Sequence, residues 1–507
     1  MNNFDILKDY VKNVCNSYTP NSINPQYLNT YIDNSELRTI VNFYDYDGTV
    51  LYAYDKDEFL SLTEMPTLPS QPGLICQGWN WSLEDAQEYV DKYDNLNIGA
   101  TYTTDDGKTR FYIELINDNT EIGINFSQTV SDGVIINWGD GSSETVSGAG
   151  EVSIAHIYPF KGEYMITLSV GNGCVVSLYS DHSNSITPSK CLKKAEIGNS
   201  VTSIGANAFQ GCTSLQSIII PDSVKEIGGS AFASCTSLQR ITIPDSVTTI
   251  GQYAFSYCYS LQSITIPDSI TTIDAYAFNY CYSLQSITIP DSVTAIGTYA
   301  FYYCSSLRNV VIGNSVTSIG EYAFSYCYSL RNVNVGNSVT SIGGRAFLKC
   351  YSLQRITIPD SVTTIGTYAF SGCSSLQSIT IPDSVTTIGN NTFRDCYSLQ
   401  SITIPDSVTS IGGSAFRNCY SLQSITIPDS VTSIGEYAFN YCYSLRCMDF
   451  TSHTSIPTLG TGALDYIPSK SEIRVPAALY DDWCNATNWS KYKDNIVGCE
   501  PHIQHFA

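Results

Sequence analysis

Histidine and charged side chains are scarce in this chain of 507 residues. It has five histidines, and charged residues make up 14% of it. Acid outnumbers base, with 47 Asp and Glu against 25 Lys and Arg, so the formal net charge is -22. Because nucleic acids and anionic membranes repel an acidic protein, we expect neither as a partner. His502 and His505 lie near Cys499 in the C-terminal tail, where a frayed end is favoured over a metal site.

Long apolar runs are also missing. No segment approaches the ~20 apolar residues of a membrane span, so we expect no membrane insertion. The first residues, MNNFDILKDYVKNVC, lack the basic start and continuous apolar stretch of a signal peptide. We expect an extracellular, cell-surface or virion-exposed protein that leaves the cell by another route, and a cytoplasmic location stays open.

The sequence lacks a convincing catalytic constellation. Asp45-Tyr46-Asp47-Gly48-Thr49 resembles the nucleophile motif of haloacid-dehalogenase-type phosphatases, and Gly139-Asp140 with Glu144 resembles their later acidic motif. That chemistry needs its acids at the end of the first strand of a parallel α/β fold that holds Mg²⁺. The intervening residues predict one helix and many turns, so a hairpin turn is favoured. We expect no enzyme activity, catalytic residue, cofactor or metal, and a Mg-dependent phosphatase-like N-terminal region is the least favoured alternative.

What the sequence does contain is one unit repeated eleven times over residues 192–444, with a period of 23 residues. The unit that starts at Leu238 reads LQRITIPDSVTTIGQYAFSYCYS. Its apolar positions alternate inward from two short strands separated by a turn, and Ala, Phe and Cys close the coil. One unit cannot bury so many apolar groups alone, so stacked units must share a core, as in a solenoid.

The consensus L-x-x-I-x-I-P-x-S-V-x-x-I-G-x-x-A-F-x-x-C-x-S resembles the BspA-like leucine-rich repeat family throughout residues 192–444. The resemblance implies a mainly β, right-handed leucine-rich-repeat solenoid of about 12 coils that binds host proteins, cell surfaces or glycans. Leu445, Met448 and Phe450 begin a twelfth unit, which contains a two-residue insertion. Residues 478–498 resemble the C-terminal caps of the same family.

Two columns of the repeat are predicted to be structural. Eleven of the 18 cysteines recur from Cys212 to Cys442, which favours a ladder of buried thiols over a disulfide framework. The Asp column, for example Asp222 and Asp245, shares its place with Asn314 and Asn337. Because Asn lacks the charge, turn capping is favoured over a calcium ladder.

The first 191 residues predict smaller β-rich domains. Residues 2–17 have helical spacing, and a short helix there would serve packing or self-association. VNFYDYDGTVLYAY (41–54) with PTLPSQPGLICQGWNWS (66–82) resembles the β-grasp-type repeats of internalin B-repeat surface proteins, and a helix is expected at Leu83 to Lys92. INWGDGSSETV (136–146) and HIYPFKGEYMITLSV (156–170) resemble the PKD-type Ig-like sandwich, which implies a spacer or binding module.

The expected organisation therefore has six parts. They are an N-terminal helix and linker (1–35), a small β-grasp-like domain (36–95), a PKD-type sandwich (96–178), a connector (179–191), the solenoid (192–470) and a C-terminal cap (471–507).

Tyrosine recurs in three columns around the Ala-Phe and Cys positions, where the units differ most. Packing between coils is one interpretation. A partner-binding surface is the other, because Tyr offers a large contact area at low entropy cost. The candidate partner-binding residues are Tyr253, Tyr257, Tyr259, Tyr276, Tyr280, Tyr282, Tyr299, Tyr303, Tyr322, Tyr326 and Tyr328. The family resemblance points instead to the strand face, so the binding face stays open.

These patterns predict a non-enzymatic adhesion or recognition protein that binds a cell-surface protein or glycan through the solenoid. Oligomers could form through the N-terminal region. The alternative function is a structural or receptor-binding component of a phage tail or another particle.

Overall fold

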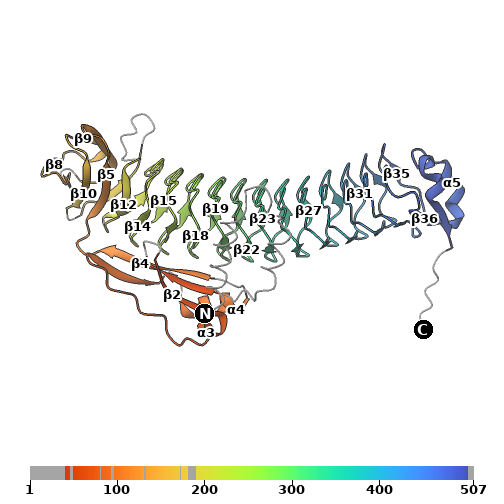
Figure 1. Ribbon diagram of the computed structural model, residues 1–507, viewed down its shortest axis with the longest axis horizontal. Helices are drawn as coiled ribbons and strands as arrows, with labels where there is room; N and C mark the ends of the chain where they lie inside the picture. The colour runs from red at the N-terminus through yellow and green to blue at the C-terminus, as the bar shows by residue number, and fades with distance from the viewer. Residues whose placement is uncertain are drawn as a thin grey trace, which may run out of the picture.

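The computed structural model describes residues 40–45, 49–79, 82–92, 96–130, 133–171, 173–180 and 190–500. The helix expected within residues 2–17 lies outside them. The chain is mainly β and elongated: a solenoid has a sandwich at one end, short helices at the other, and a small separate sheet alongside its first coils (Figure 1).

Each coil of the solenoid contributes two short strands to two parallel ladders. The first ladder contains β12 (Leu192–Glu196), β14 (Ser217–Ile219), β16 (Arg240–Ile241), β18 (Ser263–Ile264), β20 (Ser286–Ile289), β22 (Asn309–Ile312), β24 (Asn332–Asn334), β26 (Arg355–Ile356), β28 (Ser378–Thr380), β30 (Ser401–Thr403), β32 (Ser424–Thr426) and β34 (Cys447–Asp449). The second contains β13 (Val201–Ile204), β15 (Glu226–Ile227), β17 (Thr249–Ile250), β19 (Thr272–Ile273), β21 (Ala295–Ile296), β23 (Ser318–Ile319), β25 (Ser341–Ile342), β27 (Thr364–Ile365), β29 (Thr387–Ile388), β31 (Ser410–Ile411), β33 (Ser433–Ile434) and β35 (Thr458–Leu459).

The register of the ladders builds the core. Residues 23 positions apart pair directly, as Ile241 does with Ile264, so equivalent apolar side chains lie in one row. The phenylalanines form such a row, with ring centroids 5.3 Å apart between Phe278 and Phe301, and they are buried. The core is therefore shared between coils, as expected for a solenoid.

The cysteine column is buried as well and has a polar role. The Cys258 thiol donates to the carbonyl oxygen of Phe232 in the preceding coil at 3.2 Å, and the same contact recurs from Cys235 to Cys442. A small apolar side chain with a weak donor suits this position, because it fills space and also contacts a buried carbonyl.

The sandwich continues into the solenoid. It contains β5 (Thr109–Leu115), β6 (Thr120–Gln128), β7 (Val134–Asn137), β8 (Ser143–Val146), β9 (Gly150–Tyr158), β10 (Gly162–Val170) and β11 (Val176–Leu178). One of its sheets runs β8-β7-β10-β5 and then β12-β14, and the other runs β9-β6-β11 and then β13-β15. Each sandwich sheet is thus extended by one ladder of the solenoid, and the two share one core.

The small sheet has the order β2-β1-β4-β3, formed by β1 (Ile40–Tyr44), β2 (Val50–Asp55), β3 (Leu74–Trp79) and β4 (Leu96–Thr104). Two helices, α3 (Lys56–Leu60) and α4 (Leu83–Lys92), accompany it, and Asp55 and Glu58 form a capping box at the start of α3. The expected boundary between residues 95 and 96 differs from the structure. β4 pairs with β1 and β3, so residues 96–104 belong to the small sheet and not to the sandwich.

The C-terminal segment closes the far end of the solenoid. β36 (Glu472–Pro476) and β37 (Ile496–Cys499) extend the first ladder, which gives about 14 turns in all. Between them lie the 3-10 helix η1 (Ala477–Leu479), the helix α5 (Tyr480–Asn485) and the 3-10 helix η2 (Trp489–Asn495). Trp483 and Trp489 are buried against Phe450. In the part of the chain that the structure describes, no helix has the length and apolar character needed to cross a membrane.

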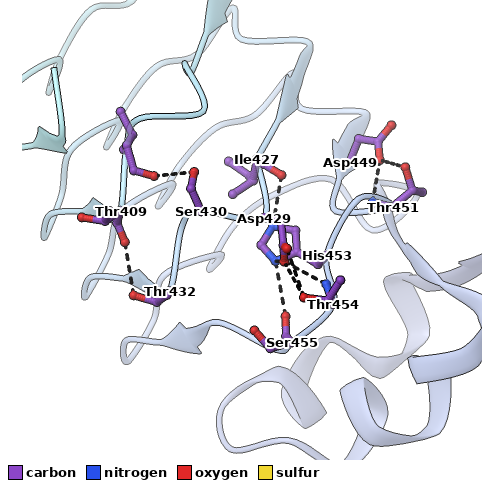
Figure 2. A network of polar contacts seen from close by, with 11 residues as sticks. Thr409, Ile427, Asp429, Ser430, Thr432, Asp449, Thr451, His453, Thr454 and Ser455 are labelled. Atoms are coloured by element: carbon purple, nitrogen blue, oxygen red, sulfur yellow. Dashed lines mark hydrogen bonds and ion pairs between the residues drawn. The ribbon is translucent and has the colours of Figure 1, made fainter. Parts of the chain in front are cut away.

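Polar contacts fix the loop that holds the two-residue insertion (Figure 2). His453 is 3% exposed, and its Nε2 lies 3.1 Å from the carbonyl oxygen of Ile427. Asp429 accepts the backbone N–H of Thr454 at 2.8 Å, and this hydrogen bond lowers the pKa of the Asp429 carboxyl. The insertion is thus held by the preceding coil and does not interrupt the ladders.

Candidate functional site

All eleven candidate tyrosines lie in the turns that connect a second strand to the next first strand, between β17 and β24. We call this surface, from Tyr253 to Tyr328, the tyrosine edge. Its rings stack from coil to coil, with centroids 4.6 Å apart for Tyr253 and Tyr276 and 4.9 Å apart for Tyr257 and Tyr280. The stacking continues through Tyr322 in the first column and Tyr326 in the second. The third column stacks from Tyr259 to Tyr282 and is interrupted by Ser305.

The backbone of the first two columns has an unusual conformation. Each of these tyrosines has a positive φ, for example 60° at Tyr253, Tyr257 and Tyr276. This left-handed region suits Gly and Asn, whereas for a bulky side chain it is an outlier that costs on the order of 1 kcal/mol or more. Other coils place small or amide residues at the same positions, with φ also positive: Asn207, Gly211, Ser230, Ser234, Gly372, Asn391 and Asn418. The turn itself therefore does not require tyrosine.

The core does not require tyrosine either. Phe232 is fully buried in a coil that has Ser230 and Ser234 at the two positions, and Phe416 is fully buried beside Ser414 and Asn418. Aromatic stacking contributes about 0.5–1.5 kcal/mol per pair, which is similar in size to the backbone cost. The net stability gained from a tyrosine ladder is consequently small, which weakens packing between coils as its main purpose.

Three further residues complete the surface. Tyr302 lies between the first two columns, in edge-to-face contact with Tyr299 at 5.0 Å and with Tyr303 at 4.9 Å. Arg345 and Lys349 take the tyrosine positions in the next coil, and their cationic groups lie 5.1 Å from the ring centroids of Tyr322 and Tyr326. The column pattern of the sequence does not reveal Tyr302, because no other coil has an aromatic residue at the equivalent position. The two cations could have been found from the 23-residue offset alone.

Several phenols of the tyrosine edge have a raised pKa. Burial and the neighbouring Tyr322 raise the pKa of Tyr299 to about 12. The pKa of Tyr276, Tyr280 and Tyr282 is raised for the same two reasons, burial first and adjacent phenols second. These four phenols therefore stay neutral over the physiological pH range.

The strand face of the first ladder, which was the other candidate surface, is partly covered. The small sheet lies against its first coils (Figure 1), where Ala100 and Tyr102 pack on Ile219. A side chain at Gly99 would come within 2.7 Å of the Thr242 hydroxyl, so the two backbones approach closely. The sequence held one indication of this docking. Ile219 is apolar at an outward position where the next two coils have threonine.

The acidic motifs with phosphatase resemblance are not brought together. Asp45 follows β1 of the small sheet and accepts a hydrogen bond from Gln71 at 2.5 Å, and Asp47 lies outside the described residues. Asp140 lies between β7 and β8 of the sandwich and contacts His156 at 2.7 Å. Among the residues with a described position, no group of three His, Cys, Asp or Glu side chains could hold a metal ion.

Comparisons with known proteins agree on the repeat region. A family model described as a BspA type leucine rich repeat region matches residues 183–308, 294–419 and 363–481. A leucine-rich repeat protein from Bacteroides ovatus is 28% identical, with a TM-score of 0.41, and the match covers 64% of this chain and 92% of that one. A leucine rich cell surface protein from Faecalibacterium prausnitzii is 32% identical, with a TM-score of 0.32 and coverage of 55% and 88%. A leucine rich repeat protein from T. pallidum is 27% identical, with a TM-score of 0.24 and coverage of 46% and 81%. Among curated proteins, none matches the sequence significantly.

Proposed function

This chain belongs to the BspA-type leucine-rich repeat family, and we propose that it is a non-catalytic recognition protein whose tyrosine edge binds a protein or glycan on a cell surface. The proposal places the molecule outside the cell or on its surface, where such a ligand is accessible.

The observation that carries the proposal is the positive φ of the tyrosines in the first two columns. A bulky residue in this region of φ and ψ persists where the surrounding structure enforces it, and such residues cluster at functional sites. Here the alternatives Ser, Asn and Gly occur in neighbouring coils and leave the core intact. A ligand that contacts the rings is a reason to retain tyrosine at a backbone position that does not favour it.

The competing strand face offers less support. Its first coils are occupied by the small sheet, and its outward residues vary less from coil to coil than those of the tyrosine edge. A surface that varies least and is partly covered suits a structural role better than recognition. The tyrosine edge is the more variable surface, and Tyr257 and Tyr259 on it are about two-fifths exposed.

Array binding of the full chain tests the proposal. The test variant replaces Tyr276, Tyr280, Tyr299 and Tyr303 together by Asn, which accepts a positive φ. The control variant carries Gln354→Ala and Arg355→Ser on the strand face. On a glycan array and on intact cells, we expect the Asn variant to lose binding and the control to keep it. Loss of binding by the control alone would move the site to the strand face.

A further inference from the structure

The stacking geometry determines which part of each ring a ligand can reach. Tyr280 lies between Tyr257 and Tyr303, with interplanar angles of 7° and 15° and centroid separations of 4.9 and 5.3 Å. Both faces of the Tyr280 ring are therefore covered by its neighbours. The same holds for Tyr276 and Tyr299 in the first column. What remains accessible within a column is the edge of each ring and its hydroxyl group.

This geometry argues against a stacking platform. Sugar rings and the planar side chains of a protein partner bind aromatic residues through the ring face, and here only the ends of the columns offer one. Protein interfaces take much of their affinity from large side chains that are fully desolvated in pockets. A row of ring edges, each fixed between two others, provides no such pocket and cannot rearrange to form one.

The hydroxyl groups offer a regular alternative. Those of Tyr276, Tyr280 and Tyr299 lie at the ring edges that the stacking leaves uncovered. Each hydroxyl has one donor and two acceptor lone pairs, so it can both donate to a ligand and accept from it. Neighbouring coils are spaced like the strands of a sheet, about 4.8 Å apart, so the groups repeat along a straight line.

The charge of the tyrosine edge restricts the class of ligand that it can bind. On this edge the cations Arg345 and Lys349 lie beyond the last tyrosines of the first two columns. Asp274 is exposed beside the first column and would repel an anionic polymer, whereas Glu321 forms an ion pair with Arg345 at 3.3 Å. A ligand that matches this surface is uncharged, rich in hydrogen-bond donors and regular along its length.

We infer that the tyrosine edge binds a linear, neutral glycan laid along the solenoid axis and held by hydrogen bonds to the phenol hydroxyls, not by stacking on the rings. This inference rests on the proposed function, since it names the ligand class of the same surface.

A Tyr-to-Phe variant measures what the hydroxyl groups contribute to binding independently of the rings. The full chain is compared with variants in which Tyr276, Tyr280, Tyr299 and Tyr303 are all Phe or all Asn. Phe keeps the ladder and the same backbone, and it removes only the oxygen atoms. Binding is measured calorimetrically with cellohexaose, laminarihexaose and mannohexaose, and with hexagalacturonate as the acidic counterpart. Circular dichroism melting verifies that both variants are folded.

We expect the wild-type chain to bind at least one neutral hexasaccharide independently of salt, and the Phe variant to bind it on the order of 30-fold more weakly. If the Phe variant keeps its affinity and the Asn variant loses it, the hydroxyl groups do not hold the ligand. The proposed function would then still stand. A wild-type chain that binds only hexagalacturonate, or none of the four, would overturn the ligand class. Undiminished binding by both variants would overturn this inference and the proposed function together.

Discussion

The guanidinium carbon of Arg240 lies 3.5 Å from the centroid of the Tyr44 ring, and this contact joins the small sheet to the strand face of the solenoid. Arg240 also donates to Ser263 and Gln262 at 3.3 Å, which holds its plane against the ladder. The segment 353–366 has the same sequence as 238–251, and it places Arg355 at the equivalent position. Arg355 is exposed, whereas Arg240 is half-buried under the small sheet.

We expect Arg240→Ser to weaken the docking of the small sheet by about 0.5–2 kcal/mol, because a partly desolvated cation–π contact contributes that amount. Hydrogen exchange should become faster in β4 and β14. Arg355→Ser is the matched control, since it removes the same side chain from an identical sequence without a bound domain. Equal exchange in the two variants would mean that Arg240 does not hold the interface.

The phenylalanine row should dominate the stability of the solenoid. Phe301 is fully buried between Phe278 and Phe324, so Phe301→Ala should lower the free energy of unfolding by about 3–5 kcal/mol through lost burial and a residual cavity. Urea titration followed by circular dichroism measures the change. A loss below about 1 kcal/mol would indicate that neighbouring coils collapse into the space.

The backbone of the tyrosine edge leads to a different expectation. Tyr276→Asn should change the free energy of unfolding by no more than about 1 kcal/mol, because the lost stacking is offset by the preference of Asn for positive φ. Tyr276→Ala loses the same ring without that compensation, so it should be the less stable of the two in urea titrations. Equal stability of the Ala and Asn variants would show that the positive φ carries no cost.

Stability of the sandwich should depend on Asp140 at low pH. Burial opposes its ionisation, but hydrogen bonds from Ser142 and the contact with His156 outweigh burial and lower the pKa of Asp140 to about 2. Because the folded-state pKa lies below the unfolded value, the contribution is present above about pH 4 and is lost as the pH falls towards about 2.

The urea midpoint of the wild-type chain should therefore fall over this window more than that of Asp140→Asn. Asp105→Asn provides the control, since Asp105 is exposed and lies outside this hydrogen-bond network. A parallel decline in the wild type and in Asp140→Asn would assign the acid sensitivity to other carboxyl groups.

The thiol of Cys76 and the thiols of the cysteine column should differ in reactivity. Cys76 is exposed, whereas the cysteine column is buried, and burial raises the pKa of Cys258 to about 12. At mildly alkaline pH, a thiol reagent should label Cys76 rapidly and should label the column only after unfolding in urea. Cys76→Ser should remove the label that Cys76 contributes. Rapid labelling of the column in the native chain would require coils that open easily.

The repeated part of the fold was predictable because the residues that point into the core recur at a fixed spacing in the sequence. Leu238, Phe255 and Cys258 recur every 23 residues, and all three are buried. The order of coils and the two strands per coil follow from apolar spacing, and the helix at Leu83–Lys92 was expected from the capping pattern of Ser82 and Asp85. The additional turns at the C-terminal end were harder to predict, because β37 follows three short helices.

The positive φ values were not predicted, although a hint was present. One column contains Tyr257, Gly372 and Asn418, and a mixture of Gly, Asn and a bulky residue indicates a left-handed position. The sequence indicated the docking of the small sheet less clearly than it indicated the positive φ values. Arg240 has the same sequence context as Arg355, so only the distant Tyr44 distinguishes the two. Assigning β4 to its sheet likewise required tertiary contacts, because an alternating strand fits either neighbour.

The continuity of the sandwich with the solenoid bears on how the chain folds. Eleven similar coils could pair in many orders, and a free array must also form its first coil unaided. The sandwich precedes the repeats in the chain, and β5 and β11 present finished strands to β12 and β13. During synthesis, each coil therefore emerges next to a completed template, from the N-terminal side onward. We therefore expect the sandwich to determine which coil forms first.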